Sequence, residues 1–320
     1  MNRSMSKLYL TAIAFLLLSA CVGSSQTNSM TGSTMGTTYT VKSVGEHSVS
    51  QVEIDTRLKQ INKTFSTWDA SSELSLLNRK PVNQWIAVSD ELFFILSESQ
   101  NLYQQTDGYF DPGIGRLIDL WGFGAVKVDY KPSRAQVSEM LQHSSIQHLR
   151  FKQGMVKKIR DIHINLSAIV KGYAVDEIDK LLNAKNSQHH LVEIGGEVVA
   201  RGQNGDKDWT LGIEQPTGGE PISLKLKNQA IATSGNYRNY FVWEDEQYMH
   251  ILEPDSGLPA KSDLTSVSVL HDKAMMADAY ATAMMAMGSQ KAATLAKQLN
   301  LSVVLILNQQ SDFKVVKINQ

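Results

Sequence analysis

A carboxylate and a hydroxyl lie four residues apart, at Asp278 and Thr282, in a segment rich in alanine and methionine. Both of those residue types favour helix, and Asp272 is suited to cap such a helix at its N-terminus. On a helix, this spacing places the two oxygen-bearing side chains on one face, one turn apart. Hard oxygen ligands suit Mg²⁺, which keeps waters or substrate phosphates in its remaining positions. A polar stripe on an otherwise apolar helix has the same spacing, and the spacing alone favours that interpretation.

A histidine beside a turn is the next residue that could do chemistry. His250 ends a strand-like run, just before Pro254 and Gly257, and catalytic side chains often project from such loops. With an ordinary pKa of about 6.5, a neutral imidazole can accept a proton from a hydroxyl near pH 7. A lone histidine is more often structural, and the sequence contains neither an HExxH motif nor a GxSxG elbow.

Two polar turns carry residue types that bind nucleotides. The turn at 107–115 has two carboxylates beside Tyr109 and Phe110, which could stack on a flat ring. A capping glycine followed by a Pro-Gly turn explains the same residues. The stretch 165–172 is typical of a strand that runs into a helix start, where backbone N–H groups and Lys171 could receive phosphate. A solvated lysine in a first helical turn is the alternative.

Two further turns are rich in small residues. Gly195 and Gly196 interrupt an apolar run and suggest a bulge or the close approach of a ligand. Residues 232–237 form a small polar turn of the kind that cradles phosphate or ribose. Neither is a Walker loop or a GxGxxG that follows a strand, so each is weak evidence by itself.

The elements that must position these residues alternate irregularly between helix and strand. Apolar spacing predicts helices near 54–65, 92–103, 133–143 and 170–184, and two more after residue 272. Strands are expected at 37–44, within 148–166, and at 191–200, 209–214, 222–226, 240–252, 265–270, 301–307 and 313–318. Without regular βαβ alternation, this pattern predicts an α+β fold, a single compact domain with mainly antiparallel sheet and flanking helices.

The N-terminal 20 residues have the features of an export signal. Arg3 and Lys7 precede an apolar run that is too short to span a membrane stably. The segment 18–21 resembles a lipobox, in which Cys21 is acylated and becomes the first residue of the mature chain. Cys21 is the only cysteine in the sequence, so no intramolecular disulfide can form. We therefore expect a lipoprotein signal peptide at 1–20 and a periplasmic, membrane-anchored protein.

The rest of the chain divides into a linker and one large domain. Residues 21–34 have the small polar composition of a flexible tether, and 35–320 are long enough for a substantial core. Loss of the two basic residues in the signal changes the net charge from −1 to −3. That balance argues against a nucleic-acid partner.

Taken together, the segments resemble the ApbE family of FAD:protein FMN transferases, in its bacterial lipoprotein form. The matching stretches run in order along nearly the whole mature chain. They are 35–39, 65–68, 72–75, 107–112, 120–124, 165–176, 195–196, 233–237, 250–254 and 277–282.

The resemblance implies an exported, Mg²⁺-dependent enzyme that cleaves FAD, attaches FMN to a Thr or Ser of a partner protein, and releases AMP. It implies His250 as the catalytic base, and a metal held by the side chains of Asp278 and Thr282 with the carbonyls of Ala168 and Ala281. The residues that match its flavin-nucleotide pocket are Met35, Trp68, Tyr109, Phe110, Asp111, Asn165, Lys171 and Leu252. Asn165 departs from the family, which usually has Asp there; an amide can still hydrogen-bond a nucleotide.

FMN transfer and two other functions remain compatible with these residues. The acceptor implied by the resemblance is a membrane redox-complex subunit that carries covalent FMN, which favours the inner membrane for the anchor. The same site could serve an FAD pyrophosphatase in which water replaces the protein hydroxyl. A non-catalytic flavin-binding lipoprotein would need the aromatic turn but neither His250 nor the Asp278–Thr282 pair, and all three residues are present.

Overall fold

The computed structural model describes residues 27–45, 49–125, 128, 130–216, 218–236, 240–243, 246–309 and 312–319. The signal peptide, Cys21 and Tyr237 lie outside these ranges. Within them, no helix has both the length and the apolar character to cross a bilayer.

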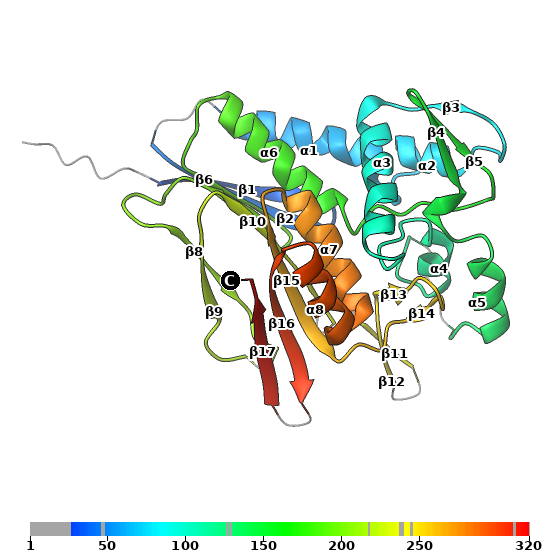
Figure 1. The fold of residues 1–320 in the computed structure, drawn as a ribbon. Coiled ribbons are helices and arrows are strands. Elements are labelled where there is room, and N and C mark those ends of the chain that lie inside the picture. The colour runs from blue at the N-terminus through cyan, green and yellow to red at the C-terminus, as the bar shows by residue number, and fades with distance from the viewer. Residues whose placement is uncertain are drawn as a thin grey trace, which may run out of the picture.

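The chain folds into helices and strands that alternate irregularly along the sequence (Figure 1). The helices are α1 (Gln51–Phe65), α2 (Glu73–Asn78), α3 (Asp90–Gln105), α4 (Gly115–Leu120), α5 (Arg134–Leu141), the 3₁₀ turn η1 (Ile146–His148), α6 (Val170–Ala184), α7 (Ala274–Met287) and α8 (Ser289–Gln298). The strands are β1 (Thr27–Thr34), β2 (Thr37–Val44), β3 (Ile86–Ala87), β4 (Leu149–Lys152), β5 (Met155–Lys158), β6 (His190–Ile194), β7 (Glu197–Arg201), β8 (Trp209–Ile213), β9 (Ile222–Leu226), β10 (Gln229–Gly235), β11 (Tyr240–Trp243), β12 (Glu246–Met249), β13 (Leu252–Glu253), β14 (Leu258–Pro259), β15 (Leu264–His271), β16 (Ser302–Gln309) and β17 (Asp312–Ile318).

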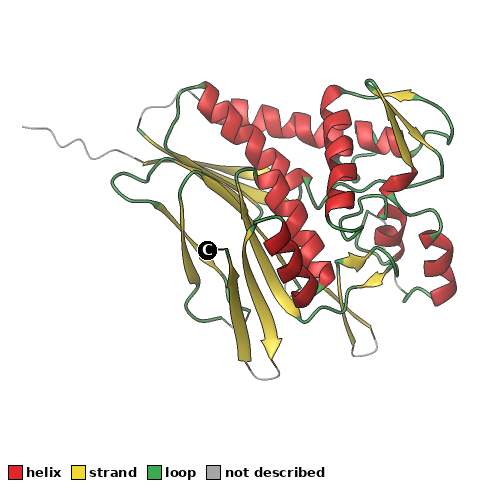
Figure 2. Ribbon diagram, viewed as in Figure 1, coloured by secondary structure: helices red, strands yellow, loops and turns green. Residues whose placement is uncertain are grey.

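One large antiparallel sheet organises the molecule. Its eight strands run in the order β1-β2-β6-β7-β10-β15-β16-β17. Helices α1, α6, α7 and α8 lie on one face, and the β8–β9 hairpin lies on the other (Figure 2). Because both faces are covered, central strands are apolar at successive positions: Val303 and Leu305 face the helices, whereas Val304 and Ile306 pack against the hairpin. The α+β fold with mainly antiparallel sheet is confirmed.

Several predicted elements have different limits in the structure. The predicted tether is wrong for residues 27–34, which form β1; their polar side chains alternate in exposure, as expected at the edge of a sheet. The run 240–252 is not one strand: it contains the β11–β12 hairpin and reaches the start of β13, which pairs with β14. Gly195 and Gly196 form the turn between β6 and β7, with φ of 60° and 103°, rather than a bulge.

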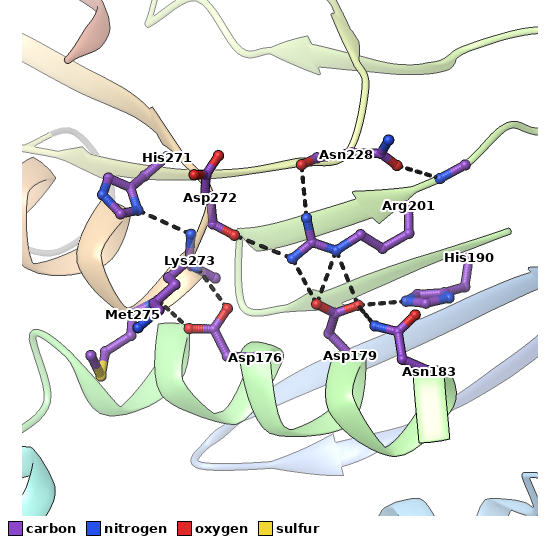
Figure 3. A network of polar contacts seen from close by, with 12 residues as sticks. Asp176, Asp179, Asn183, His190, Arg201, Asn228, His271, Asp272, Lys273 and Met275 are labelled. Atoms are coloured by element: carbon purple, nitrogen blue, oxygen red, sulfur yellow. Dashed lines mark hydrogen bonds and ion pairs between the residues drawn. The ribbon is translucent and has the colours of Figure 1, made fainter. Parts of the chain in front are cut away.

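Helix α7 is capped from another helix. The predicted N-cap Asp272 is wrong, since the helix begins at Ala274 after Lys273, which makes no side-chain cap. Instead Asp176 of α6 accepts the backbone N–H groups of Ala274 at 2.7 Å and Met275 at 3.0 Å (Figure 3). A carboxylate on the first N–H groups satisfies donors that the helix cannot pair, and it favours the positive end of the helix dipole.

Candidate active site

A cleft of about 640 Å³ opens where the large sheet meets α6, α7 and the loops beside α3 and α4. Among the described residues, its walls include ten of the residues predicted for the site: Tyr109, Phe110, Asp111, Asn165, Ala168, Lys171, His250, Leu252, Asp278 and Thr282. They come from segments up to 173 residues apart in sequence, so only the fold brings them together.

One wall of the cleft is formed where α6 closely approaches α7. A Cβ atom at Gly172 would lie 2.3 Å from the carbonyl oxygen of Ala274, so a side chain is excluded at this crossing. The Gly172 N–H donates to Asp278 Oδ2 at 3.1 Å. This contact sets Lys171, one residue before the glycine, beside the carboxylate of Asp278.

Lys171 lies between two buried carboxylates. Its Nζ is 2.6 Å from Glu197 Oε1 and 3.8 Å from Asp278 Oδ1. Burial works to lower the pKa of Lys171, but the charges of Asp278 and Glu197 outweigh it and the pKa is raised. Burial raises the pKa of Asp278, and it raises the pKa of Glu197 to about 7 in spite of the ammonium. One cation therefore serves two carboxyl groups that have been removed from water.

The four-residue spacing places Asp278 and Thr282 on the same face of α7. Helix α7 is buried on nearly all sides, and these two side chains both reach the cleft wall. Thr282 Oγ1 lies 3.2 Å from Ser234 Oγ at the end of β10. Asp278 is only 3 % exposed, so the pair is not a solvated stripe.

These oxygens fit a hard divalent cation. Within the described parts of the chain, no three His, Cys, Asp or Glu side chains form a metal-binding group. A site here would instead combine the Asp278 carboxylate and the Thr282 hydroxyl with backbone carbonyls, a donor set that Mg²⁺ accepts when waters and phosphate complete it. In the same described region, the buried Oε2 of Glu197 has no hydrogen-bond partner.

The aromatic turn forms another wall. Asp107 and Gly108 have φ of 53° and 83°, a left-handed pair that reverses the chain after α3. Phe110 is buried, whereas Tyr109 is partly exposed and its hydroxyl accepts a hydrogen bond from Lys291. Of the two rings, Tyr109 is the more available for stacking on a flat ligand.

Asp111 and Asn165 shape the loops as well as the cleft. Asp111 Oδ1 accepts the backbone N–H groups of Gly113 and Ile146, both at 2.7 Å. Burial raises the pKa of Asp111 to about 6. Asn165 Oδ1 accepts the Ser167 N–H at 2.9 Å, so the amide makes the hydrogen bond that an Asp would make, with one fewer negative charge.

His250 lines the cleft from the bend between β12 and β13. It is half-buried, and its ring meets that of Phe123 edge-on at a centroid distance of 6.3 Å. Leu252 follows at the start of β13 and is buried against the lobe that contains α4 and α5. The imidazole and the Asp278–Thr282 pair therefore face one cleft from different elements.

Three predicted site residues are absent from the described walls of the cleft. Met35 lies at the β1–β2 turn with φ of 50°, and Ala281 is buried within α7. Trp68 is 72 % exposed, an unusual position for so large an apolar ring.

Sequence reasoning overlooked Glu197, the group nearest to the Lys171 ammonium. It is the first residue of β7, directly after the glycine pair, and is 3 % exposed. A carboxylate that ends a Gly-Gly turn was the available signal. In the sequence the Gly-Gly pair indicates a turn, whereas the acidic side chain gains its significance from the contact with Lys171 of α6.

A network of polar contacts joins α6 to the sheet and to the start of α7 (Figure 3). Asp179 of α6 accepts from Arg201 of β7, with the shortest contact at 2.7 Å, and lies 2.7 Å from His190 Nε2 of β6. Arg201 also donates to the carbonyl oxygens of Asn228 and Asp272, before β10 and α7. This network and the Asp176 cap join α6 to the sheet and to the start of α7, which fixes the helices that carry Lys171 and Asp278.

Comparison with known proteins gives consistent matches. The model of the ApbE family matches residues 35–305. A protein of Haemophilus influenzae named FAD:protein FMN transferase is 34 % identical over 98 % of this chain and 95 % of its own. A protein of the same name from Vibrio cholerae is 33 % identical over 96 % and 95 %. The solved flavin transferase ApbE from Vibrio cholerae superposes with a TM-score of 0.86, at 32 % identity, over 92 % of this chain and 97 % of its own.

Proposed function

This chain belongs to the ApbE family, and we propose that it transfers the FMN moiety of FAD to a protein hydroxyl. In the finer form of the proposal, Mg²⁺ is required, the acceptor is a Thr or Ser, and AMP is released. The observation that carries it is the shared cleft of His250, Lys171 and the Asp278–Thr282 pair. The relatives that are named FAD:protein FMN transferase support the same reaction.

The residues of the cleft suit attack on a pyrophosphate. The acceptor hydroxyl attacks the FMN phosphorus, the bond to the AMP oxygen breaks, and His250 takes the hydroxyl proton. Lys171, already directed into the cleft, can pair with phosphate oxygens that gain charge as the leaving group departs. The partly exposed ring of Tyr109 offers a surface for the isoalloxazine.

The proposed Mg²⁺ ligands are the side chains of Asp278 and Thr282 and the carbonyls of Ala168 and Ala281. When bound, Mg²⁺ supplies charge neutralisation on the bridging and leaving oxygens of the pyrophosphate. The Asp278 carboxylate accepts the Gly172 N–H, and the Thr282 hydroxyl is hydrogen-bonded to the Ser234 hydroxyl. Both contacts restrict the rotamers of the two side chains before any ligand arrives.

Location and acceptor are further parts of the proposal. We infer a protein exported to the periplasm and anchored by acylated Cys21, which places the cleft near a membrane. The acceptor is then a flavinylated subunit of a membrane redox complex, for which the inner membrane is the natural site. The support is the N-terminal sequence, with its short basic region, apolar run and lone cysteine.

The decisive experiment incubates the purified chain with FAD, a candidate acceptor subunit, and either Mg²⁺ or EDTA. Transfer gives in-gel flavin fluorescence on the acceptor in the Mg²⁺ arm only, and replacement of the acceptor Thr by Val abolishes it. Free FMN and AMP without labelled acceptor would instead identify a pyrophosphatase. FAD that is bound but remains intact in both arms would identify a non-catalytic flavin carrier.

A further inference from the structure

The cleft is unusually acidic for a site that is proposed to receive a pyrophosphate. Among the described residues, five carboxyl groups line it: Asp111, Glu193, Glu197, Glu214 and Asp278. The same lining contains a single ammonium, that of Lys171, and the imidazole of His250. A nucleotide phosphate that enters such a cleft meets net repulsion unless cations accompany it.

Glu197 makes the shorter of the two carboxylate contacts with this ammonium. Its Oε1 is 2.6 Å from Lys171 Nζ, a shorter contact than the 3.8 Å between that nitrogen and Asp278 Oδ1. The Glu197 side chain is 3 % exposed and that of Lys171 is 31 % exposed, so water reaches the pair only from the lysine side. Its Oε2 is buried without a hydrogen-bond partner in the described structure.

We propose that Glu197 makes nucleotide binding conditional on a divalent cation. Without a bound cation it holds Lys171 and cancels the charge that would otherwise attract phosphate. A cation at Asp278 and Thr282 reverses this balance, so the pyrophosphate and Lys171 can then pair. Glu197 is thus a positioning residue that acts through Lys171, and the inference rests on the proposed use of FAD.

The test measures FAD affinity rather than turnover. FAD is titrated into the full chain with excess Mg²⁺ or with EDTA, and binding is followed by flavin fluorescence. Wild type should bind far more weakly in EDTA. In Glu197→Gln, which keeps the shape but removes the charge, the ratio of the two Kd values should fall about tenfold, mainly through tighter binding in EDTA.

A matched control is available on the same turn. Glu193 also lines the cleft, but its carboxylate accepts the Gly196 N–H at 2.9 Å and is more exposed. Glu193→Gln removes an equal charge at a better-screened position and should leave the Kd ratio within about twofold of wild type. Glu197→Met, similar in shape and without polar atoms, guards against a misfolded amide variant and should behave like Glu197→Gln.

Three outcomes would contradict the inference. An unchanged Kd ratio in folded Glu197→Gln and Glu197→Met, judged by thermal unfolding, overturns the inference. A wild type that binds FAD equally in Mg²⁺ and EDTA also overturns it, while FMN transfer can still stand. A wild type that binds no FAD in either condition overturns the proposed function and this inference together.

Discussion

Asp278 accepts the Gly172 N–H at 3.1 Å and also turns toward the cleft, so its side chain serves both the helix crossing and the proposed ligand site. Lys171 likewise pairs with carboxylates in the fold while facing the cleft. A substitution at either position changes packing and chemistry at once. Variants that separate the two effects are therefore the informative ones.

Asp278→Asn and Asp278→Ala should separate structure from charge. Asn can still accept the Gly172 N–H, whereas Ala leaves that buried donor unpaired, at a cost of about 1–3 kcal/mol. We expect the Ala variant alone to lose that much unfolding free energy in urea titration. Both should lose Mg²⁺-dependent transfer, and an unchanged Mg²⁺ titration of activity in Asp278→Asn would contradict the ligand role.

His250→Ala should lower FMN transfer by about 10²–10⁴-fold, the usual contribution of a general base. FAD affinity should change little, because the proposed base acts on the acceptor hydroxyl rather than on the nucleotide. Acceptor labelling and FAD titration on the same preparation measure the two quantities. Equal transfer by variant and wild type would refute the proposed base.

At the scale of elements, the site depends on how α6 crosses α7. At this crossing Gly172 lies against the backbone of α7, and Asp176 caps the start of α7. Arg201 of β7 holds α6 to the sheet through Asp179. Neither helix holds the site alone, since Lys171 belongs to α6 and the Asp278–Thr282 pair to α7. A substitution that shifts α6 relative to α7 should therefore weaken cation binding.

Gly172→Ala should force the two helices apart, since its Cβ would lie 2.3 Å from the Ala274 carbonyl oxygen and 2.7 Å from the Met275 Cα. Overpacking of this kind costs about 1–3 kcal/mol. We expect a lower urea midpoint and a higher Mg²⁺ concentration for half-maximal transfer. Wild-type values for both would show that the backbones can separate without consequence.

The Asp179 network should make stability depend on acid pH. Burial works to raise the pKa of Asp179, but hydrogen bonds from His190 and Arg201 outweigh it, and the pKa falls below 3.8. A lowered folded-state pKa stabilises the protein above the unfolded value and loses that contribution as pH falls through the folded value. Asp179→Asn leaves Arg201 with a neutral partner and should cost about 3–5 kcal/mol at pH 7.

Urea unfolding from pH 7 to pH 3 measures this effect. The difference between wild type and Asp179→Asn should stay constant down to about pH 4 and shrink below it. Asp272→Asn is the control, because Arg201 contacts only the backbone carbonyl of Asp272. A pH-independent difference would mean that Asp179 contributes by shape rather than by charge.

At the scale of the whole molecule, the sheet extends beyond the part that matches the family model. Strand β1 precedes residue 35 and pairs with β2 along its full length. Gly32 makes room for the ring of Tyr39, which a Cβ would meet at 2.5 Å. Gln51 of α1 donates to the Thr31 carbonyl at 2.8 Å and so ties the strand to the helical layer.

A chain that begins at residue 35 should therefore be less stable than one that begins at residue 27. The loss should be about 2 kcal/mol or more, because cross-strand pairs contribute roughly 0.2–1 kcal/mol each. It would also expose β2 as a new edge that promotes aggregation. Urea midpoints and light scattering of the two chains make the comparison, and identical values would mean that β1 is only an appendage.

Local patterns were enough for much of the fold. Helix periodicity predicts α1, α3 and α6, and the four-residue spacing places Asp278 and Thr282 on one face of α7. Such features depend on residues one or two turns apart, and the backbone geometry relates them without knowledge of the fold. The resemblance rested on the same local segments.

Contacts between distant segments were decided by tertiary structure alone. The cap of α7 joins residues 98 apart, and the sequence favoured Asp272 because it is adjacent. Strand β1 was missed because its polar residues resemble a linker until β2 pairs with them. Glu197 became significant only when the β6–β7 turn met α6 and aligned it with Lys171. Spacing along one helix is a local property, whereas the charge balance of a buried cleft depends on which segments the fold removes from water together.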